Sequence, residues 1–364
     1  MYTISQIQGI EWELTTKCNA ACPQCVRNFY GGDTIKSLPL ISQSLEQFKK
    51  AIPWDQMSSL KQIYFCGTYG DPIACPDLLK ICEWLKENTS INVTIHTNGG
   101  LQSAKYWQKL AKVVDKCAFG IDGLEDTNHL YRRNVQWQKL MRNAKAFINN
   151  GGNAIWDFIV FKHNQHQVQE AKTMSSDLGF ADFNFKKTHR FLDKKHDLIQ
   201  KSPVMNSKQE IEYYLEMPTN EEYKNKVSED YVRLEKQYGS FKEYAMLTNI
   251  VCYKLQVKDI YISGPGHVFP CGWLADRMYG HEPENHPDHA RMKHLWTSLG
   301  GEHKANLFHT PFKEIVEEGW LPLLERTWTN KDRLERCGVQ CGSDMTHIKS
   351  SAKIKYKNDY AKIT

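Results

Sequence analysis

The sequence predicts an α/β fold built on a partial parallel barrel. Short runs rich in β-branched and aromatic residues recur in the first half of the chain and predict strands at 9–15, 60–66, 91–97, 116–121, 155–161 and 182–186. Helical stretches lie between these runs, such as 77–86, which follows Pro76, and 137–148, which ends before Gly151. Alternation of strands and helices implies a parallel sheet with right-handed crossovers. Counting the first strand, the pattern gives six βα units, fewer than the eight of a complete barrel.

Length and composition limit the class of protein. The chain has 364 residues, enough for two modest domains, and carries eleven cysteines. No apolar run is long enough to span a bilayer and the first residues do not form a signal peptide, so we expect a soluble, cytoplasmic protein with no membrane partner. In a reducing compartment, cysteines are metal ligands or free thiols rather than disulfides. The net charge of +5 is mildly basic and does not require nucleic acid.

Three cysteines follow the first predicted strand: Cys18, Cys22 and Cys25. A cubane iron–sulfur cluster takes one ligand for each iron, so three thiolates leave one iron open to a non-protein ligand. The same residues are also compatible with a zinc site completed by a distant His or Cys, or with ordinary buried thiols.

The Cys-x3-Cys-x2-Cys spacing after a first strand resembles the radical S-adenosylmethionine (SAM) superfamily. The resemblance implies a partial (β/α)6 TIM-like barrel and a [4Fe-4S] cluster held by these three cysteines, with the open iron chelating the amino and carboxyl groups of SAM. In that family, one electron cleaves the sulfonium and gives a 5′-deoxyadenosyl radical, which abstracts hydrogen from the substrate. Gln24 stands where the family often has an aromatic residue beside the adenine.

Further motifs of the family follow in the family's order. The segment 67–72 resembles a Gly-Gly-Glu-Pro loop that binds the cofactor ammonium, with Asp71 in place of the Glu. Polar residues end the third and fourth strands, and Gly120 stands where the family often has Ser. Arg133 matches an arginine that commonly meets the cofactor carboxylate, for which a guanidinium is suited. The resemblance thus assigns SAM binding to Gln24, Gly70, Asp71, Pro72, Thr97, Asn98, Asp122 and Arg133.

A second cysteine set lies near the C-terminus: Cys252, Cys271, Cys337 and Cys341. The segment 257–271 predicts a β-hairpin that turns at residues 264–266. Four thiolates fully ligate a cubane cluster, and a four-thiolate zinc site fits the same spacing. The pattern resembles the twitch extension of radical SAM enzymes, a truncated SPASM domain that holds one auxiliary [4Fe-4S] cluster. We expect the remaining central cysteines to be buried thiols: Cys66, Cys75, Cys82 and Cys117.

The chain is expected to divide into four parts. Residues 1–189 form the radical SAM barrel, 190–249 a helical bridging insertion with helix-like runs at 208–214 and 230–236, 250–342 a small hairpin-and-helix domain for the auxiliary cluster, and 343–364 a basic tail. The histidines between residues 281 and 294, interrupted by Pro283 and Pro287, indicate a polar loop rather than a metal site.

These features predict a radical SAM oxidoreductase that removes hydrogen from a small molecule or a peptide side chain, with the auxiliary cluster as electron acceptor. A peptide-modifying maturase is the first alternative, and a non-catalytic, zinc-stapled binding protein the second. Reduction of the first cluster requires an external donor of the flavodoxin or ferredoxin type. The sequence identifies no catalytic acid or base, but polar and aromatic residues near later strand ends and after Cys271 are candidates for substrate contact: Trp156, Asp157, Lys162, Lys186, Lys187, His189, Arg190, Trp273 and Arg277.

Overall fold

One curved sheet organises the molecule. The computed structural model describes residues 2–192 and 198–346. Its main sheet has eight strands in the order β10-β9-β1-β2-β3-β4-β5-β6, and all neighbours are parallel except β10. The strands are β1 (Gly9–Trp12), β2 (Gln62–Phe65), β3 (Asn92–Thr97), β4 (Lys116–Gly120), β5 (Ala154–Val160), β6 (Asp182–Lys187), β9 (Asp259–Ile262) and β10 (Val268–Phe269). The predicted α/β partial barrel is therefore confirmed.

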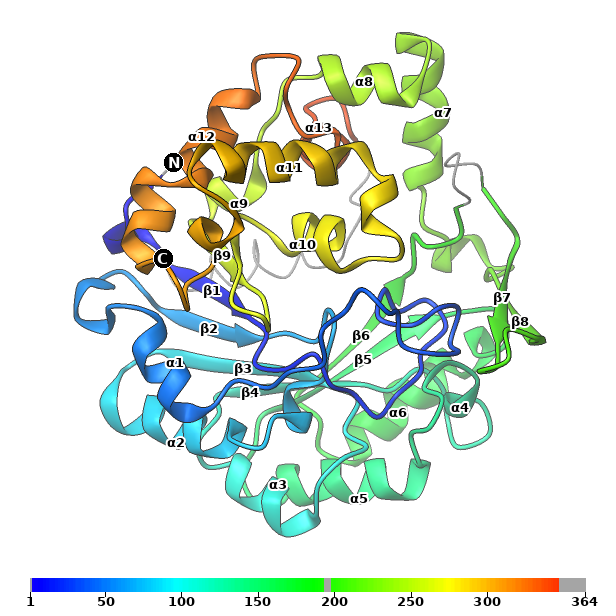
Figure 1. Ribbon diagram of the computed structural model, residues 1–364. Coiled ribbons are helices and arrows are strands. Elements are labelled where there is room, and N and C mark those ends of the chain that lie inside the picture. Colours follow the sequence, from blue (N-terminus) through cyan, green and yellow to red (C-terminus); the bar gives the residue numbers. More distant parts are fainter. Residues whose placement is uncertain (1, 193–197, 347–364) are drawn as a thin grey trace.

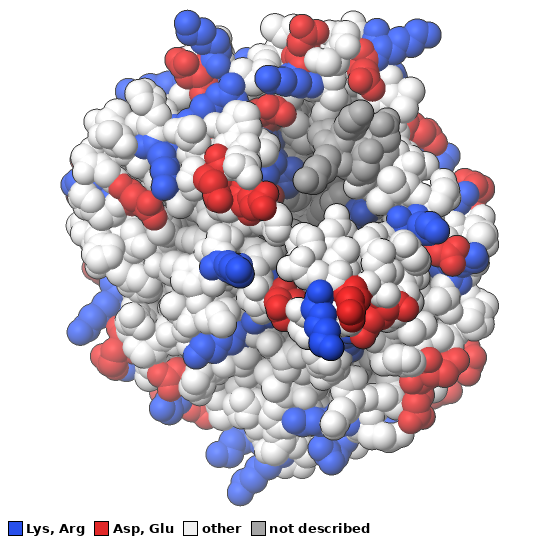
Figure 2. Space-filling view, turned by 45° about the vertical axis from the view of Figure 1, so that its right-hand side comes forward, with Lys and Arg blue, Asp and Glu red and all other residues white. Residues whose placement is uncertain are grey.

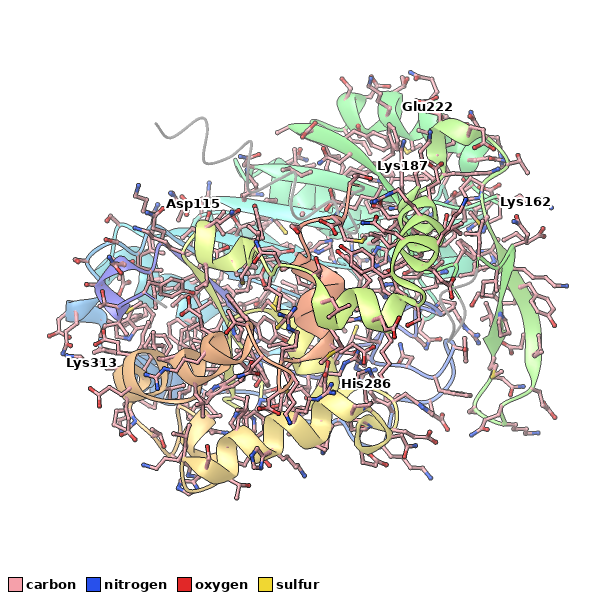
Figure 3. The ribbon with its side chains drawn as sticks, turned by 90° about the horizontal axis from the view of Figure 1, so that it is seen from above. Asp115, Lys162, Lys187, Glu222, His286 and Lys313 are labelled. Atoms are coloured by element: carbon pink, nitrogen blue, oxygen red, sulfur yellow. The ribbon has the colours of Figure 1, made fainter. Side chains whose placement is uncertain are left out.

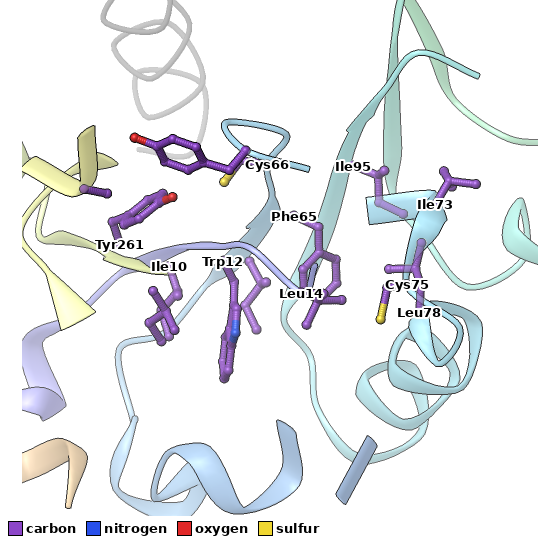
Figure 4. Close-up of a cluster of buried hydrophobic side chains, with 14 of the residues drawn as sticks. Ile10, Trp12, Leu14, Phe65, Cys66, Ile73, Cys75, Leu78, Ile95 and Tyr261 are labelled. Atoms are coloured by element: carbon purple, nitrogen blue, oxygen red, sulfur yellow. The ribbon is translucent and has the colours of Figure 1, made fainter. Parts of the chain in front are cut away.

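The crossover helices cover one face of this sheet, below it in Figure 1. They are α1 (Leu45–Ala51), α2 (Leu78–Asn88), α3 (Ala104–Leu110), α4 (Asn128–Tyr131), α5 (Trp137–Ile148) and α6 (Val168–Asp177). Alternate strand side chains point toward these helices. Trp12 and Phe65 are fully buried there, and Phe48 of α1 packs against both rings (Figure 4). The opposite side chains of each strand, such as Glu11 and Glu13 on the β1 side, face the concave interior of the barrel.

The C-terminal helices lie on the other side of the sheet, above it in Figure 1. They are α9 (Tyr253–Gln256), α10 (Gly272–Tyr279), α11 (Pro287–Ser298), α12 (Trp320–Thr327) and α13 (Glu335–Cys341), with α7 (Val227–Tyr238) and α8 (Phe241–Leu247) beside α13. The hairpin expected at 257–271 is present as β9 and β10, but it is not a separate sheet. Strand β9 pairs in parallel with β1, so that Gly9 lies opposite Asp259 and Trp12 opposite Ile262.

Two local expectations are corrected. The run 208–214 is not helical: residues 208–210 lie in the turn between β7 (Lys201–Met205) and β8 (Ile211–Glu216), and residues 211–214 lie in β8 of this two-stranded antiparallel sheet. Tyr213 and Leu215 alternate with exposed neighbours, which is the two-residue period of a strand. The histidine-containing segment is not a loop either, because Pro287 is the first residue of α11.

One further expectation for this region is confirmed and two are not tested. The run 230–236 lies within α7 and is helical as predicted. Most of the predicted basic tail, from residue 347 on, lies outside the described residues. The division into four parts stays a prediction.

Charged side chains of both signs are spread over the face of the molecule shown in Figure 2. Within the described residues, no helix has the length and apolar character needed to cross a bilayer. On the face shown in Figure 2, Lys and Arg side chains are interspersed with Asp and Glu and form no continuous basic surface. This pattern agrees with the mild net charge of +5.

Candidate functional site

The first three cysteines lie in a loop at the carboxyl end of β1. Backbone hydrogen bonds from Thr16 N to Ile41 O (3.1 Å) and from Gln43 N to Leu14 O (2.8 Å) fix the start and the end of this loop. The structure thus places the cysteines at the edge where parallel α/β sheets gather their binding groups.

Each of the three sulfurs has a polar neighbour from a different element. Asn98 Nδ2 donates to Cys18 Sγ (3.5 Å), Arg132 Nη1 lies 3.7 Å from Cys22 Sγ, and Cys25 Sγ lies 3.9 Å from the carbonyl oxygen of Thr68. Burial raises the pKa of Cys18, and it raises the pKa of Cys22 to about 11. The neighbouring sulfurs add to both shifts, which shows that the three thiols are close together.

The predicted cofactor loops meet at the same edge through Asp71. Its carboxylate accepts hydrogen bonds from Ile73 N (3.0 Å), Thr97 Oγ1 (2.9 Å) and Asn98 N (2.8 Å). Burial raises the pKa of Asp71, against these hydrogen bonds. The Asp71 side chain therefore ties the loop after β2 to the loop after β3. Pro72 starts the short 3-10 helix Pro72–Ala74 that follows.

Gly70 fits this loop against the chain that leads to the cysteines. A Cβ atom at Gly70 would lie 2.0 Å from the carbonyl oxygen of Thr15. Only glycine permits this approach of two backbones. The predicted residues Gly70, Asp71, Pro72, Thr97 and Asn98 are thus brought together beside Cys18.

Asp122, Arg132 and Gly120 form a buried unit next to Cys22. Arg132 Nε lies 2.6 Å from Asp122 Oδ2, whose carboxylate is fully buried. A Cβ atom at Gly120 would lie 2.1 Å from Arg132 Nη2, so the guanidinium occupies the space where a side chain at position 120 would be. Burial raises the pKa of Asp122 and Arg132 lowers it.

Arg133, which the sequence assigned to the cofactor carboxylate, points elsewhere. Its Nη2 pairs with Glu212 Oε2 of β8 (2.5 Å) and its Nη1 donates to Met205 O (2.9 Å). The arginine that reaches the cysteine loop is therefore its neighbour Arg132. Gln24 also turns from the loops after β2 and β3, since its Oε1 accepts a hydrogen bond from Thr188 Oγ1 (3.0 Å) beyond β6.

The four C-terminal cysteines line one cavity. Cys252 precedes α9, Cys271 precedes α10, and Cys337 and Cys341 lie on α13. The cavity wall also includes Ile250, Pro270, Trp273, Leu274, Trp328, Arg336 and Gln340. A hydrogen bond to Cys341, together with burial, raises the pKa of the Cys252 thiol. Burial and the charge of Cys341 raise the pKa of Cys271 to about 12.

Both sets supply donors that suit an iron–sulfur cluster: three thiols with a position left over, and four thiols around one cavity. In the part of the chain that the structure describes, no group of three or more His, Cys, Asp or Glu side chains is arranged to hold a metal ion. The ligand assignments therefore stay predictions that rest on the grouping of the sulfurs.

Asp288 of α11 holds the helix that carries two of these cysteines. Its fully buried carboxylate accepts hydrogen bonds from Glu335 N (2.8 Å) and Arg336 N (2.7 Å) at the start of α13. Arg291 Nη1 lies 3.1 Å from the same carboxylate. On the opposite side, Gly338 contacts α8 so closely that a Cβ atom would lie 1.9 Å from Ala245 O.

The candidate substrate residues separate into different environments. Asp157 faces the barrel interior, where Lys186 Nζ (2.5 Å) and His96 Nε2 (3.6 Å) approach its Oδ2. Trp156 points the other way and is buried against Phe180.

Other candidates lie far from the barrel interior or carry partners. Lys162 pairs with Glu216 of β8 (2.6 Å), and Figure 3 shows it near the exposed hairpin. Arg277 pairs with Asp276 (3.0 Å). Trp273 lines the C-terminal cavity.

Three functional candidates were missed at the sequence level. Arg132 was passed over for its neighbour, Asp288 lies in a segment expected to be a loop, and Glu13 is an acidic residue inside an apolar strand. Only Glu13 carried a local signal, because a charge in a buried strand requires a partner or a purpose.

The structure is thus a partial parallel α/β barrel with three cysteines in the loop after its first strand. Residues 12–173 match the family model of the Radical SAM superfamily. This match covers 162 of the 364 residues and includes the three cysteines after β1.

Solved structures of anSMEcpe share the fold. The structure of anSMEcpe with bound AdoMet is 14% identical, with 98% of this chain and 93% of that chain covered and a TM-score of 0.52. The structure of anSMEcpe with AdoMet and Cp18Cys peptide is 14% identical, with 97% and 96% covered and a TM-score of 0.50. SuiB from Streptococcus suis is 14% identical, with a TM-score of 0.48; 77% of this chain matches it, and the chain spans 64% of SuiB. No curated protein sequence matches the chain significantly.

Proposed function

We propose that the chain is a two-cluster radical SAM enzyme that oxidises its substrate by two electrons. The observation that carries this proposal is the separation of seven cysteine thiols into two groups. Three lie with the cofactor loops after β1, and four surround the cavity between α9, α10 and α13. The first group leaves an open coordination position for SAM and the second does not, which suits a reactive cluster and an electron acceptor.

When bound at the first site, the cluster and SAM would supply the radical that abstracts hydrogen. The residues of the chain would bind and orient the cofactor. Thr97 and Asn98 are held in place by Asp71, and Arg132 Nη1 lies 3.7 Å from Cys22 Sγ. A guanidinium that is already oriented by Asp122 suits a carboxylate ligand, so we propose Arg132 for the SAM carboxylate.

The substrate is proposed to be a small molecule or a peptide side chain. The second option is supported by the fold shared with anSMEcpe, which was solved with a bound peptide. A polar interior around Asp157, Lys186 and His96 offers donors and acceptors to either class. An external flavodoxin or ferredoxin is the proposed electron donor, in the reducing cytoplasm that the cysteine content suggests.

Metal analysis separates this proposal from a zinc-stapled binding protein. After anaerobic reconstitution we expect about eight irons per chain and little zinc, because each cubane holds four irons. One zinc at the C-terminal site without iron would support the binding protein instead.

A triple variant with Cys18, Cys22 and Cys25 replaced by Ala tests the reactive cluster. We expect it to lose SAM cleavage completely and to keep roughly half of the iron, in the C-terminal site. Mass spectrometry of 5′-deoxyadenosine and iron analysis measure both results. If the triple variant still forms 5′-deoxyadenosine, the assignment of the radical cluster is wrong.

A further inference from the structure

One buried carboxyl group lies between the two cysteine groups, and one of its oxygens accepts no hydrogen bond from the described residues. Glu13, at the carboxyl end of β1, is completely buried. Its Oε1 accepts a short hydrogen bond from Tyr69 N (2.6 Å). Among the described residues, its Oε2 has no hydrogen-bond partner, and neither have the buried hydroxyls of Tyr69 and Tyr261. Buried polar atoms without partners are rare, and such a group indicates a place where a ligand or water completes the hydrogen bonds.

Glu13 contacts the radical-cluster side through the loop after β2. Tyr69 belongs to the loop 67–72, and the carbonyl oxygen of the preceding Thr68 lies 3.9 Å from Cys25 Sγ. The carboxyl group is therefore attached to the loop that is expected to bind SAM.

The same carboxyl faces the auxiliary side through β9. The Tyr261 hydroxyl approaches it and lowers its pKa. The Tyr261 ring packs against the residue after Cys271, since a Cβ atom at Gly272 would lie 3.1 Å from Tyr261 Cε2. Figure 4 shows Tyr261 and Cys66 on the same side of β1.

The other buried acids at the strand ends are fully engaged. Asp71 accepts hydrogen bonds from three donors, and Asp122 and Asp157 pair with Arg132 and Lys186. Glu11, the next acid on the same face of β1, pairs with Lys254 (2.8 Å). Glu13 is thus the acid of this region without a cationic partner in the described structure.

We propose that Glu13 is the catalytic base that accepts the proton lost by the substrate radical during its oxidation. The step rests on the proposed function. After hydrogen abstraction, an O–H or N–H bond of the substrate radical breaks and a carbonyl or imine double bond forms. The proton goes to Glu13 Oε2, and the electron goes to the acceptor already proposed, the auxiliary cluster.

The surroundings of Glu13 match this task. Burial raises its pKa to about 8, while the Tyr69 N–H and the nearby Tyr261 hydroxyl lower it. The titratable groups that interact electrostatically with Glu13 are all neutral or acidic. They are Glu11 of β1, Cys66 at the end of β2, Tyr69 in the following loop, Tyr261 of β9 and Tyr279 of α10. A carboxyl with a pKa near the working pH is an efficient proton acceptor. Since the base must be ionised, activity should rise with pH until it levels off above about pH 8.

The first experiment measures the protonation of Glu13 without any substrate. Infrared difference spectra compare wild type with Glu13→Gln, and Glu11→Gln serves as the matched control on the same strand face. We expect a protonated-carboxyl band near neutral pH that disappears around pH 8, is absent in Glu13→Gln and persists in Glu11→Gln. If Glu13 stays protonated well above pH 8, it cannot accept a proton from the substrate and the proposal is overturned.

The second experiment tests the chemical step on the reconstituted enzyme with SAM, dithionite and a cell extract that contains small molecules and peptides. Wild type should form 5′-deoxyadenosine and a product that has lost a pair of hydrogens. Glu13→Gln keeps an acceptor for Tyr69 N, so 5′-deoxyadenosine should change less than about threefold while the product falls by about 100-fold or more, the usual contribution of a general base.

The outcomes distinguish the two proposals. Equal amounts of product from wild type and Glu13→Gln overturn the role of Glu13 only. Equal losses of 5′-deoxyadenosine and product show that Glu13 merely positions the SAM loop, which also overturns the role as a base. A wild type that forms no 5′-deoxyadenosine, or forms it without any oxidised product, contradicts the proposed function itself.

Discussion

The two cysteine sites are built in different ways. The first set comes from one stretch of eight residues, 18–25, and each sulfur is met by a residue from a strand-end loop of the barrel or the helix after one. The second set comes from three separate segments, around residues 252, 271 and 337–341, which meet only because α13 docks beside α9 and α10. The first site thus depends on a continuous parallel sheet, and the second depends on a few contacts between short helices.

Because the two sites are built differently, they should differ in how strongly a single substitution disrupts them. On the barrel side, Asp71 and Asp122 each satisfy several groups of neighbouring strand-end loops, so the first site is supported from many directions. On the auxiliary side, the start of α13 depends on Asp288 alone for two backbone amides. The smaller α7–α8 cluster packs on the far side of α13 around Tyr244 and Val339.

Among the variants that test this difference between the two sites, Asp288→Ala is expected to have the largest effect. The substitution leaves the amides of Glu335 and Arg336 unpaired and removes the partner of Arg291, at a cost on the order of 2 kcal/mol. We expect loss of most of the auxiliary iron, about four of about eight atoms, with SAM cleavage retained. Iron analysis and 5′-deoxyadenosine formation measure the two sites separately.

Two further variants control this experiment. Asp288→Asn keeps one carbonyl acceptor and should lose less iron than Asp288→Ala. Asp71→Ala is the reciprocal change on the barrel side, and it should impair SAM cleavage while the auxiliary iron stays. If Asp288→Ala and Asp71→Ala lose iron from both sites equally, the two sites are one cooperative unit and the contrast between them fails.

The contrast also explains what the sequence alone could predict. The strands, the barrel and the first cysteine loop follow from local patterns: short β-rich runs and a spacing of three cysteines within eight residues. Local alternation around Tyr213 was present too, but the polar, charged setting of residues 208–214 favoured a helix. Here pairing with β7, which runs from Lys201 opposite Glu216 to Met205 opposite Ile211, decided the structure.

Other features depend on partners that are distant in the sequence. Arg132 lies beside the cysteine loop because it pairs with Asp122. Arg133 points away because it pairs with Glu212, which follows it by 79 residues. Asp288 acts on an amide 47 residues later. Strand β9 joins β1 across the whole length of the barrel domain. No local pattern encodes these contacts, because they arise only when the chain is folded.

A second prediction sharpens the barrel side of the comparison. Replacing Arg132 should weaken SAM binding, since a charge-assisted hydrogen bond contributes about 1.5–3 kcal/mol, which is roughly a 10- to 100-fold change in Kd. The double variant Arg132→Met with Asp122→Asn avoids leaving a buried carboxylate unpaired. Anaerobic calorimetry with SAM measures the effect.

Arg133→Ala is the matched control for this measurement. Its guanidinium is engaged by Glu212 and Met205 O, so we expect SAM affinity to change less than about threefold, as for loss of an exposed pair. A large loss of affinity in Arg133→Ala with none in the Arg132 double variant would restore the assignment that the sequence motif suggested.

The smallest expected effect is a pH dependence of stability on the barrel side. Burial lowers the pKa of His163 from 6.5 to about 4, and its ring stacks on Phe161 with centroids 5.4 Å apart. As the pH falls below about 6.5, the unfolded chain takes up a proton that the folded chain refuses, so the folded state loses up to about 1.4 kcal/mol per pH unit. Between about pH 7 and pH 5.5 this amounts to about 1 kcal/mol and a fall of the melting temperature by about 2 °C. In His163→Phe this part of the fall should vanish in anaerobic thermal scans. An unchanged pH dependence in the variant would show that His163 does not govern the acid sensitivity.

The counterpart in the auxiliary region is His286. Burial also lowers the pKa of this side chain to about 4, but the side chain is half-exposed, so its contribution to the pH dependence should be smaller.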